Sequence, residues 1–80
     1  MDKTISVLGI LVDERGEFAP QVQQVLTRHG QSILMRSGTP SPDREKGIIT
    51  LVMECHRNEI AEIKRELEGI KTVKVGAVTL

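Results

Sequence analysis

Three side chains of this sequence are typical metal ligands: His29, Cys55 and His56. Two imidazoles and one thiolate form a donor set that suits a soft divalent metal such as zinc, nickel or copper. Cys55 and His56 are adjacent, however, and adjacent residues of a strand point to opposite faces of its sheet. A metal site would therefore need one of these side chains to turn, or a ligand from a second subunit. The alternative is a small buried cysteine, a histidine favoured by the dipole at a helix C-terminus, and a surface histidine.

A second group of residues could bind an anion. Asp13-Glu14-Arg15-Gly16 follows an apolar run and precedes an amphipathic segment, so it predicts a turn that leads into a helix. The N-terminus of a helix offers backbone N–H groups to a carboxylate or phosphate, and Arg36 or Arg44 would add charge-assisted hydrogen bonds if they reach it. The alternative is an ordinary turn beside an ordinary hairpin loop. The residues that we predict for a ligand site are Asp13, Arg15, Gly16, Arg36 and Gly38.

The sequence predicts neither an enzyme nor a cofactor. Nucleophilic catalysis needs a base that a third group orients, and the spacing of the residues suggests no such set. A heavy-metal transport domain needs a Cys-x-x-Cys loop where this chain has Asp13–Gly16. An acylphosphatase needs a glycine-rich, arginine-bearing phosphate loop, which Leu11-Val12-Asp13-Glu14 does not supply.

Hydrophobic periodicity predicts six elements along the chain. They are a strand over Lys3–Val12, a helix from about Gly16–Ala19 to His29, strands over Ser32–Ser37 and Gly47–Cys55, a helix between Asn58 and Gly69, and a strand over Thr72–Leu80. This order is that of a ferredoxin-like α+β (βαββαβ) domain. Eighty residues are enough for one such domain, so we expect residues 1–80 to form a single unit.

A few residues should mark the ends of these elements. Gly30 is expected to take the left-handed position after the first helix, Asn58 to be the N-cap of the second helix, and Gly69 to terminate it. The stretch Gly38–Gly47 contains two prolines and a run of charges, which is typical of a solvated hairpin loop.

The expected sheet has an unusual pattern on its central strands. Right-handed crossovers give an antiparallel sheet of order 4-1-3-2 with both helices on one face. Its central strands are then Lys3–Val12 and Gly47–Cys55, and each is apolar on both sides. A sheet with helices on one face needs only one apolar side, so the second predicts that another subunit covers the open face. We therefore expect a homo-oligomer, either a dimer or a tetramer. An aspartate or lysine at Ile10 or Leu51 should split it if those side chains face the partner.

Composition narrows the possible partners and location. Eleven basic residues balance eleven acidic ones, and no basic cluster favours phosphate contacts, so we expect no direct nucleic-acid binding. Phe18 is the single aromatic residue, which leaves no strand aromatics to stack on bases. One cysteine fits a reducing cytoplasm. The start Met1-Asp2-Lys3 has no signal-peptide pattern, and no apolar run approaches the roughly 20 residues of a membrane span. We expect a soluble cytoplasmic protein with no membrane partner.

Part of the chain resembles the ACT-domain pattern. The matching residues are Asp13-Glu14-Arg15-Gly16-Glu17-Phe18, then Val22, Leu26, His29-Gly30 and Ile33. ACT domains are regulatory modules that pair through their sheets and bind small ligands, often amino acids, near that first loop and the subunit interface. The resemblance implies a regulatory domain with a small-molecule effector or a partner protein.

A closer resemblance covers nearly the whole chain. Ile33-Leu34-Met35-Arg36-Ser37-Gly38-Thr39-Pro40 and Gly47-Ile48-Ile49-Thr50-Leu51-Val52 look like a family of small proteins named putative iron-only hydrogenase system regulators. Their fold is similar to the C-terminal domain of nickel-responsive repressors. This chain has no His-x-His on its strands and no ribbon-helix-helix segment, so the nickel site and direct operator binding of those repressors do not carry over. The resemblance implies a regulator; the alternative function is a metal sensor that uses His29, Cys55 and His56.

Overall fold

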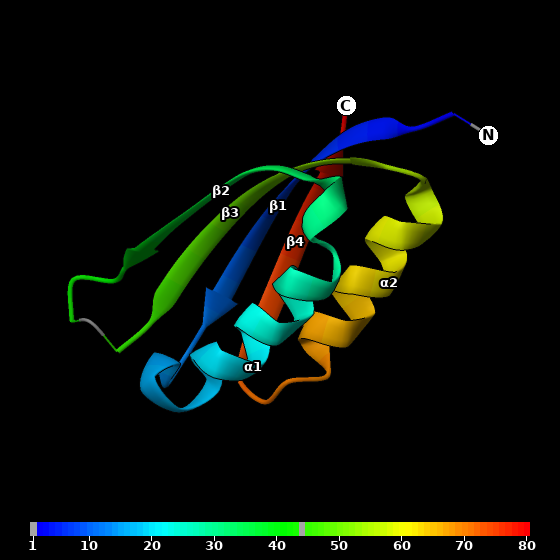
Figure 1. The fold of residues 1–80 in the computed structure, drawn as a ribbon. Helices are drawn as coiled ribbons and strands as arrows, with labels where there is room; N and C mark the ends of the chain where they lie inside the picture. Colours follow the sequence, from blue (N-terminus) through cyan, green and yellow to red (C-terminus); the bar gives the residue numbers. More distant parts are fainter. Residues whose placement is uncertain (1, 44) are drawn as a thin grey trace.

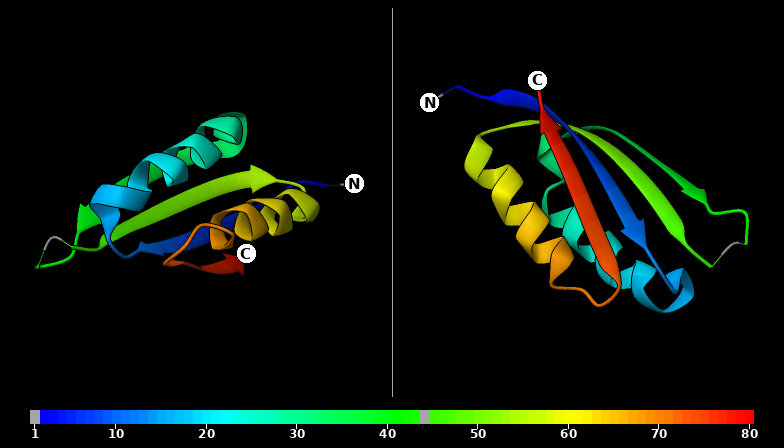
Figure 2. Two further views of the ribbon diagram at one scale, coloured as in Figure 1. Left: turned by 90° about the horizontal axis from the view of Figure 1, so that it is seen from below. Right: turned by 180° about the vertical axis from the view of Figure 1, so that it is seen from behind.

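The protein is seen in a computed structural model that describes residues 2–43 and 45–80. In chain order the elements are β1 (Thr4–Val12), α1 (Arg15–Arg28), a short 3-10 turn (Gly30–Ser32), β2 (Ile33–Pro40), β3 (Gly47–Cys55), α2 (Arg57–Glu68) and β4 (Val73–Thr79) (Figure 1). The antiparallel strands lie in the order β2-β3-β1-β4, and both helices lie behind the sheet in the right-hand view of Figure 2. The predicted ferredoxin-like fold, its sheet order and its helical layer are therefore confirmed.

The two central strands divide their side chains cleanly between the two faces of the sheet. Leu8 pairs with Leu51 and Ile10 with Ile49 in the register of β1 and β3, and Leu8, Ile10 and Leu51 are fully buried beneath the helices. The prediction that both sides of these strands are apolar holds. Ile10 and Leu51, however, belong to the core, so a charge at either position would unfold the domain rather than split an assembly.

The helices complete this core with apolar stripes at helical spacing. Fully burying one such side chain contributes about 1.5–3 kcal/mol, so the stripes fix which side of each helix faces the sheet. The buried residues of α1 are Phe18, Val22, Val25 and Leu26, and those of α2 are Ile60, Ile63 and Leu67. Among the described residues, no helix is both long and apolar enough to cross a membrane.

Helix α1 begins one residue earlier than the start predicted at Gly16–Ala19. Glu14 is the N-cap and has a left-handed backbone with φ 50° and ψ 51°. Its own N–H donates to Asp13 Oδ1 (2.9 Å), and its carbonyl accepts the N–H groups of Glu17 and Phe18 (2.9 and 3.2 Å). This local hydrogen bonding lets the chain turn without glycine, and Gly16 lies inside the first turn.

Two other residues that were predicted to cap the helices do not do so, and one prediction is confirmed. Gly30 does not have a positive φ, because the chain continues into the 3-10 turn and Ser32 N–H donates to the His29 carbonyl (3.0 Å). The N-cap of α2 is the extended residue His56, so Asn58 lies within the first turn of the helix. Gly69 does follow the last residue of α2, as predicted, with a right-handed backbone.

Strand β2 is longer than predicted, and the hairpin loop is correspondingly shorter. Gly38, Thr39 and Pro40, which were expected in the loop, pair with Ile49, Ile48 and Gly47 of β3. Pro40 is compatible with this position because β2 is an edge strand and Pro40 ends it. The extension of β2 brings Gly38 into the sheet, opposite α1.

Candidate ligand groove

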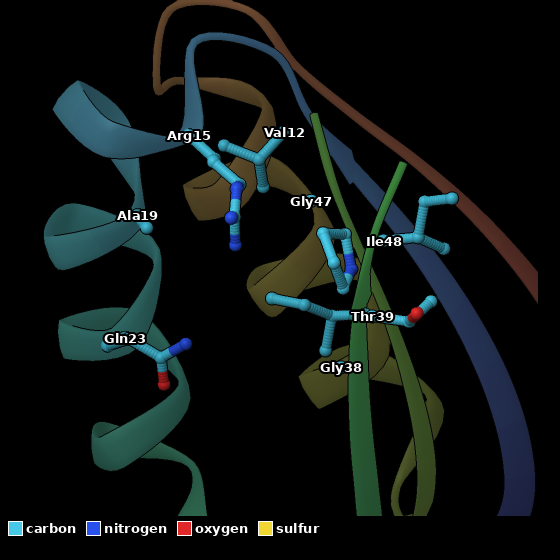
Figure 3. Close-up of a pocket in the computed structure, with 10 residues that line it drawn as sticks. Val12, Arg15, Ala19, Gln23, Gly38, Thr39, Gly47 and Ile48 are labelled. Carbon is cyan, nitrogen blue, oxygen red and sulfur yellow. The ribbon is translucent and has the colours of Figure 1, made fainter. Parts of the chain in front are cut away.

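A groove lies between helix α1 and the β2–β3 hairpin, on the helical side of the sheet (Figure 3). Its volume is about 190 Å³. Four elements form its walls: the end of β1, the first half of α1, and the paired ends of β2 and β3. The lining residues are Val12, Arg15, Ala19, Gln23, Gly38, Thr39, Pro40, Gly47, Ile48 and Ile49.

Small residues keep this groove open. Gly38 pairs with Ile49 and Gly47 with Pro40, so both glycines occupy positions on the strands that face α1. A Cβ at Gly38 would have only the Ile48 carbonyl oxygen nearby, at 4.0 Å. A Cβ at Gly47 would lie 3.6 Å from the Cβ and Cδ of Arg15. The hairpin thus approaches the helix without side chains that would fill the space between them.

Polar side chains enter the groove from α1. Arg15, Ala19 and Gln23 follow one another at intervals of four residues, which places them on one face of the helix. The side chains of Arg15 and Gln23 point from the helix toward the hairpin (Figure 3). Gln23 was not among the predicted site residues, although its spacing from Arg15 could have indicated it.

Arg36 joins the strand to the helix at one end of the groove. Its Nη2 donates a hydrogen bond to Oε1 of Gln23. Arg36 faces α1 because a bulge between Ile33 and Met35 shifts the register of β2 and sets which side chains point toward the helices.

The predicted site residues are only partly brought together. Arg15 and Gly38 line the groove, and Arg36 lies beside it through Gln23. Gly16 does not line the groove but lies in two depressions beside it. One is shared with Glu14, Arg15, Glu17 and Glu45, and the other with Arg15, Ala19, Pro20 and Gln23. Asp13 is not among the groove residues: its carboxylate accepts the Glu14 N–H and its carbonyl accepts the hydroxyl of Thr72 (2.7 Å). Arg44 lies outside the described residues.

The N-terminus of α1 has a partner within the protein. The Arg15 N–H donates to the carbonyl of Glu45 in the hairpin loop (2.9 Å). The helix start and the hairpin therefore share one end of the molecule, as the sequence predicts. This N–H is already satisfied, so a ligand would meet side chains in the groove rather than that backbone group.

At the opposite end of α1, His29 lies between two carboxylates of α2. Its Nδ1 is 3.0 Å from Glu59 Oε2 and its Nε2 is 3.3 Å from Glu66 Oε1, and the side chain is 9% exposed. Ser32 donates its hydroxyl to Glu59 (3.0 Å), and Arg28 donates to Glu66 (2.9 Å). We call these five residues the His29 clasp.

The His29 clasp favours a charged histidine. Burial by itself lowers the pKa of His29, but the hydrogen bonds and charges of Glu59 and Glu66 outweigh it and raise the pKa above its ordinary value of 6.5. The hydrogen bond from His29 lowers the pKa of Glu59, and that from Arg28 lowers the pKa of Glu66. Both ring nitrogens of a protonated histidine are donors, which matches an acceptor on each side.

The three predicted metal ligands do lie at one end of the molecule. The hydrogen bond and charge of His29 lower the pKa of Glu59, and the charge of His56 lowers it further. Burial raises the pKa of the Cys55 thiol, and the negative charge of Glu59 adds to that rise. Cys55 is buried in the core, whereas Nδ1 of His56 lies 3.4 Å from the carbonyl oxygen of Asp2. Within residues 2–43 and 45–80, no group of three or more His, Cys, Asp or Glu side chains is arranged to hold a metal ion.

The open face of the sheet is a second surface of interest. It carries the side chains of β1, β3, β2 and β4 that alternate with the buried ones, and Val7 pairs there with both Val52 and Val78. Gly9 and Gly76 form a pair without side chains in the same region. Glu54 and Lys74 lie at opposite ends of this face. Its apolar members are Ile5, Val7, Leu11, Met35, Ile48, Val52 and Val78.

Comparison with known proteins shows the family to which the chain belongs. Residues 4–77 match the TM1266-like family, described as "Iron-only hydrogenase system regulator, putative". The structure is similar to that of the uncharacterized protein TM1266 from Thermotoga maritima, with a TM-score of 0.93, 30% sequence identity, and coverage of 99% of each chain. No curated protein matches the sequence significantly.

More distant structures share the fold alone. An ACT domain protein from Streptococcus pneumoniae has a TM-score of 0.58 at 15% identity, over 95% of this chain and 89% of that chain. An unknown protein from Galdieria sulphuraria has a TM-score of 0.72 at 8% identity, over 99% of this chain and 46% of that chain. The ACT-like architecture and both resemblances seen in the sequence are confirmed, and the chain belongs to the TM1266-like family.

Proposed function

We propose that this protein is a regulatory domain without enzymatic activity. It self-associates through the open face of its sheet and binds a small-molecule effector in the groove. The observation that carries the proposal is the apolar surface of the central strands on the side away from the helices. The family to which the chain belongs supports a regulatory role.

The open face is suited to a second copy of the same chain. Met35, Ile48 and Val78 are 50%, 41% and 61% exposed there, around the paired Val7 and Val52. Soluble monomers rarely expose contiguous apolar patches of more than a few hundred Å². A two-fold interface uses the same patch twice. This patch carries one carboxylate, Glu54, and one ammonium, Lys74, so its formal charges cancel and two copies do not repel each other.

The β2–β3 hairpin connects the groove to the open face. Thr39 and Ile48 line the groove, yet their side chains point away from it (Figure 3), toward the open face. A ligand on one side of these two strands and a second copy on the other would contact the same short segment. Effector binding that changes the position of the hairpin would thereby change the affinity between copies, which is a coupling between two sites. Regulation of this kind acts through other proteins and needs no DNA contact by this chain.

Val52→Lys tests the assembly. This substitution places an ammonium in the centre of the open face and leaves the buried face of β3 unchanged. We expect the unaltered protein to sediment as a dimer or larger oligomer at micromolar concentration, and Val52→Lys to sediment as a folded monomer.

Gln24→Lys is the matched control for that experiment. It adds the same charge at an exposed position of α1, on the other side of the molecule, and should leave the oligomer intact. A monomeric unaltered protein, or an oligomer that survives Val52→Lys, would refute the proposed interface.

A further inference from the structure

The residues that line the groove carry one formal charge, and it is positive. The charge belongs to Arg15, and none of the ten lining residues is Asp or Glu, although the chain contains eleven acidic residues. The neighbouring acids Glu14, Glu17 and Glu45 do not line the groove; they line an adjoining depression, which Arg15 also lines. An anionic group would therefore meet a cation in the groove, whereas an ammonium would meet no carboxylate among the lining side chains.

A second cation lies beside the groove. The Arg36 guanidinium is hydrogen-bonded to the side-chain amide oxygen of Gln23, which is a neutral acceptor. The bond to Gln23 has a charge on the donor alone, whereas a carboxylate would bring a charged acceptor that can accept two N–H groups of a guanidinium at once. A ligand carboxylate near Gln23 would therefore gain from both Arg15 and Arg36.

The rest of the groove is apolar and small. Val12, Ala19, Pro40 and Ile49 provide hydrocarbon walls. The volume of the groove is about 190 Å³. Sites for drug-sized ligands are larger, about 300–1,000 Å³. The space fits a short branched hydrocarbon chain and a single polar head.

Because of this charge, shape and size, we propose that the groove binds small aliphatic monocarboxylates. This inference rests on the proposed effector site. The carboxylate lies between the Arg15 guanidinium and the Gln23–Arg36 pair, and the branched tail packs against Val12, Ala19 and Pro40. An α-ammonium group has no acidic partner in the lining. The groove therefore favours a simple carboxylate over the amino acid with the same skeleton.

Four ligands with the same carbon skeleton separate the contribution of the carboxylate charge from that of the hydrocarbon tail. Isovalerate is an anion, isovaleramide is neutral, isoamylamine is a cation and valine is a zwitterion. Each is titrated into the protein while the backbone amide signals of Gly38 and Gly47 are followed by NMR. We expect isovalerate to shift both signals and to bind at least about ten-fold more tightly than the other three. Isovaleramide and isoamylamine have no carboxylate for the charge-assisted bonds, and valine has one but also brings an ammonium that meets no acidic side chain in the lining. Inorganic phosphate, which has charge but no tail, should bind more weakly than isovalerate.

The outcomes distinguish this inference from the effector site on which it rests. If isovaleramide, isoamylamine or valine shifts the glycine signals with equal or higher affinity, the proposed charge selectivity is wrong while the effector site stands. Phosphate binding more tightly than isovalerate would refute the apolar subsite. If none of the ligands shifts Gly38 and Gly47, both the ligand class and the groove as an effector site are wrong.

Two substitutions locate the binding. Arg15→Gln removes one of the two cations and should reduce the preference for isovalerate over isovaleramide, while Arg36 retains part of it. Gly38→Val fills the groove from β2 and should abolish binding of both. Ser37→Val places the same side chain on the opposite face of the same strand, as the register of β2 requires, and should retain binding. Binding that survives Gly38→Val in a folded protein would overturn the proposal.

Discussion

The two ends of helix α1 meet the rest of the molecule in opposite ways. At its C-terminal end the helix is joined to α2 by the His29 clasp, whose side chains hydrogen-bond to one another. At its N-terminal end the helix faces a groove in which glycines replace side chains. The side chains at the first end hydrogen-bond to one another, whereas the second end borders a groove that has space for another molecule.

This difference indicates which part of the domain can respond to a ligand. In the part of the chain that the structure describes, every buried side-chain nitrogen or oxygen has a hydrogen-bond partner. A helix fixed at one end and loosely packed at the other adjusts most easily at the loosely packed end. Changes on ligand binding should therefore occur around Arg15 and the hairpin rather than around His29.

Among changes at the two ends of α1, removing a carboxylate from the clasp should have the largest effect on stability. Glu59→Ala leaves Nδ1 of His29 and the hydroxyl of Ser32 without their acceptor. We expect a loss of about 2 kcal/mol in the free energy of unfolding, measured by urea denaturation. Glu62→Ala, at an exposed position of the same helix, should change it by less than about 0.5 kcal/mol. Equal effects of the two substitutions would show that the clasp does not fix this end of α1.

The clasp should also make the stability depend on pH. The raised pKa of His29 gives a contribution that is complete below pH 6.5 and is lost as the pH rises through its folded-state value. The lowered pKa values of Glu59 and Glu66 give contributions that are present above pH 4.5 and are lost as the pH falls through their folded-state values. Stability from the clasp is therefore highest between these two limits. His29→Gln should remove the decline on the alkaline side, as followed by thermal melts at a series of pH values; an unchanged decline would contradict this assignment.

The smallest predicted effects come from the backbone at the two ends of α1. Gly30 has no positive φ, and a Cβ there would contact nothing within 4 Å, so Gly30→Ala should stabilise by about 0.5 kcal/mol. Glu14 has φ 50°, a conformation that costs an L-residue roughly 1–2 kcal/mol. Glu14→Gly should relieve part of that cost and also stabilise, by about 0.5 kcal/mol after the added freedom of the unfolded chain. Destabilisation by either substitution in chemical denaturation would contradict the backbone geometry.

The strands and helices could be predicted from the sequence because apolar spacing directly encodes which faces are buried. The two-sided apolarity of β1 and β3 was also visible, although the sequence did not show that Ile10 and Leu51 face the helices. The end signals were less reliable, since Asn58 and Gly30 are favourable cap residues that the chain does not use as caps. In each case a local preference competed with packing or hydrogen bonds formed nearby.

The contacts that define the two ends of α1 depend on tertiary structure. Glu59 and Glu66 are seven residues apart and therefore share a helix face, but their pairing with His29 requires α1 to pack beside α2. Arg36 was a candidate from its charge alone. Its hydrogen bond to Gln23 depends on the bulge in β2, and no residue pattern in the strand predicts that bulge.

The same irregularity of β2 bears on aggregation. A regular exposed edge strand is a template on which further chains can add and form fibrils. Here β2 is an edge strand, its register is broken between Ile33 and Met35, and it ends in Pro40, which has no N–H to donate. An incoming strand would find neither a continuous ladder nor a complete set of donors along this edge. The kinked edge therefore limits open-ended polymerisation at β2, and restoring a regular strand there would raise the tendency to form fibrils.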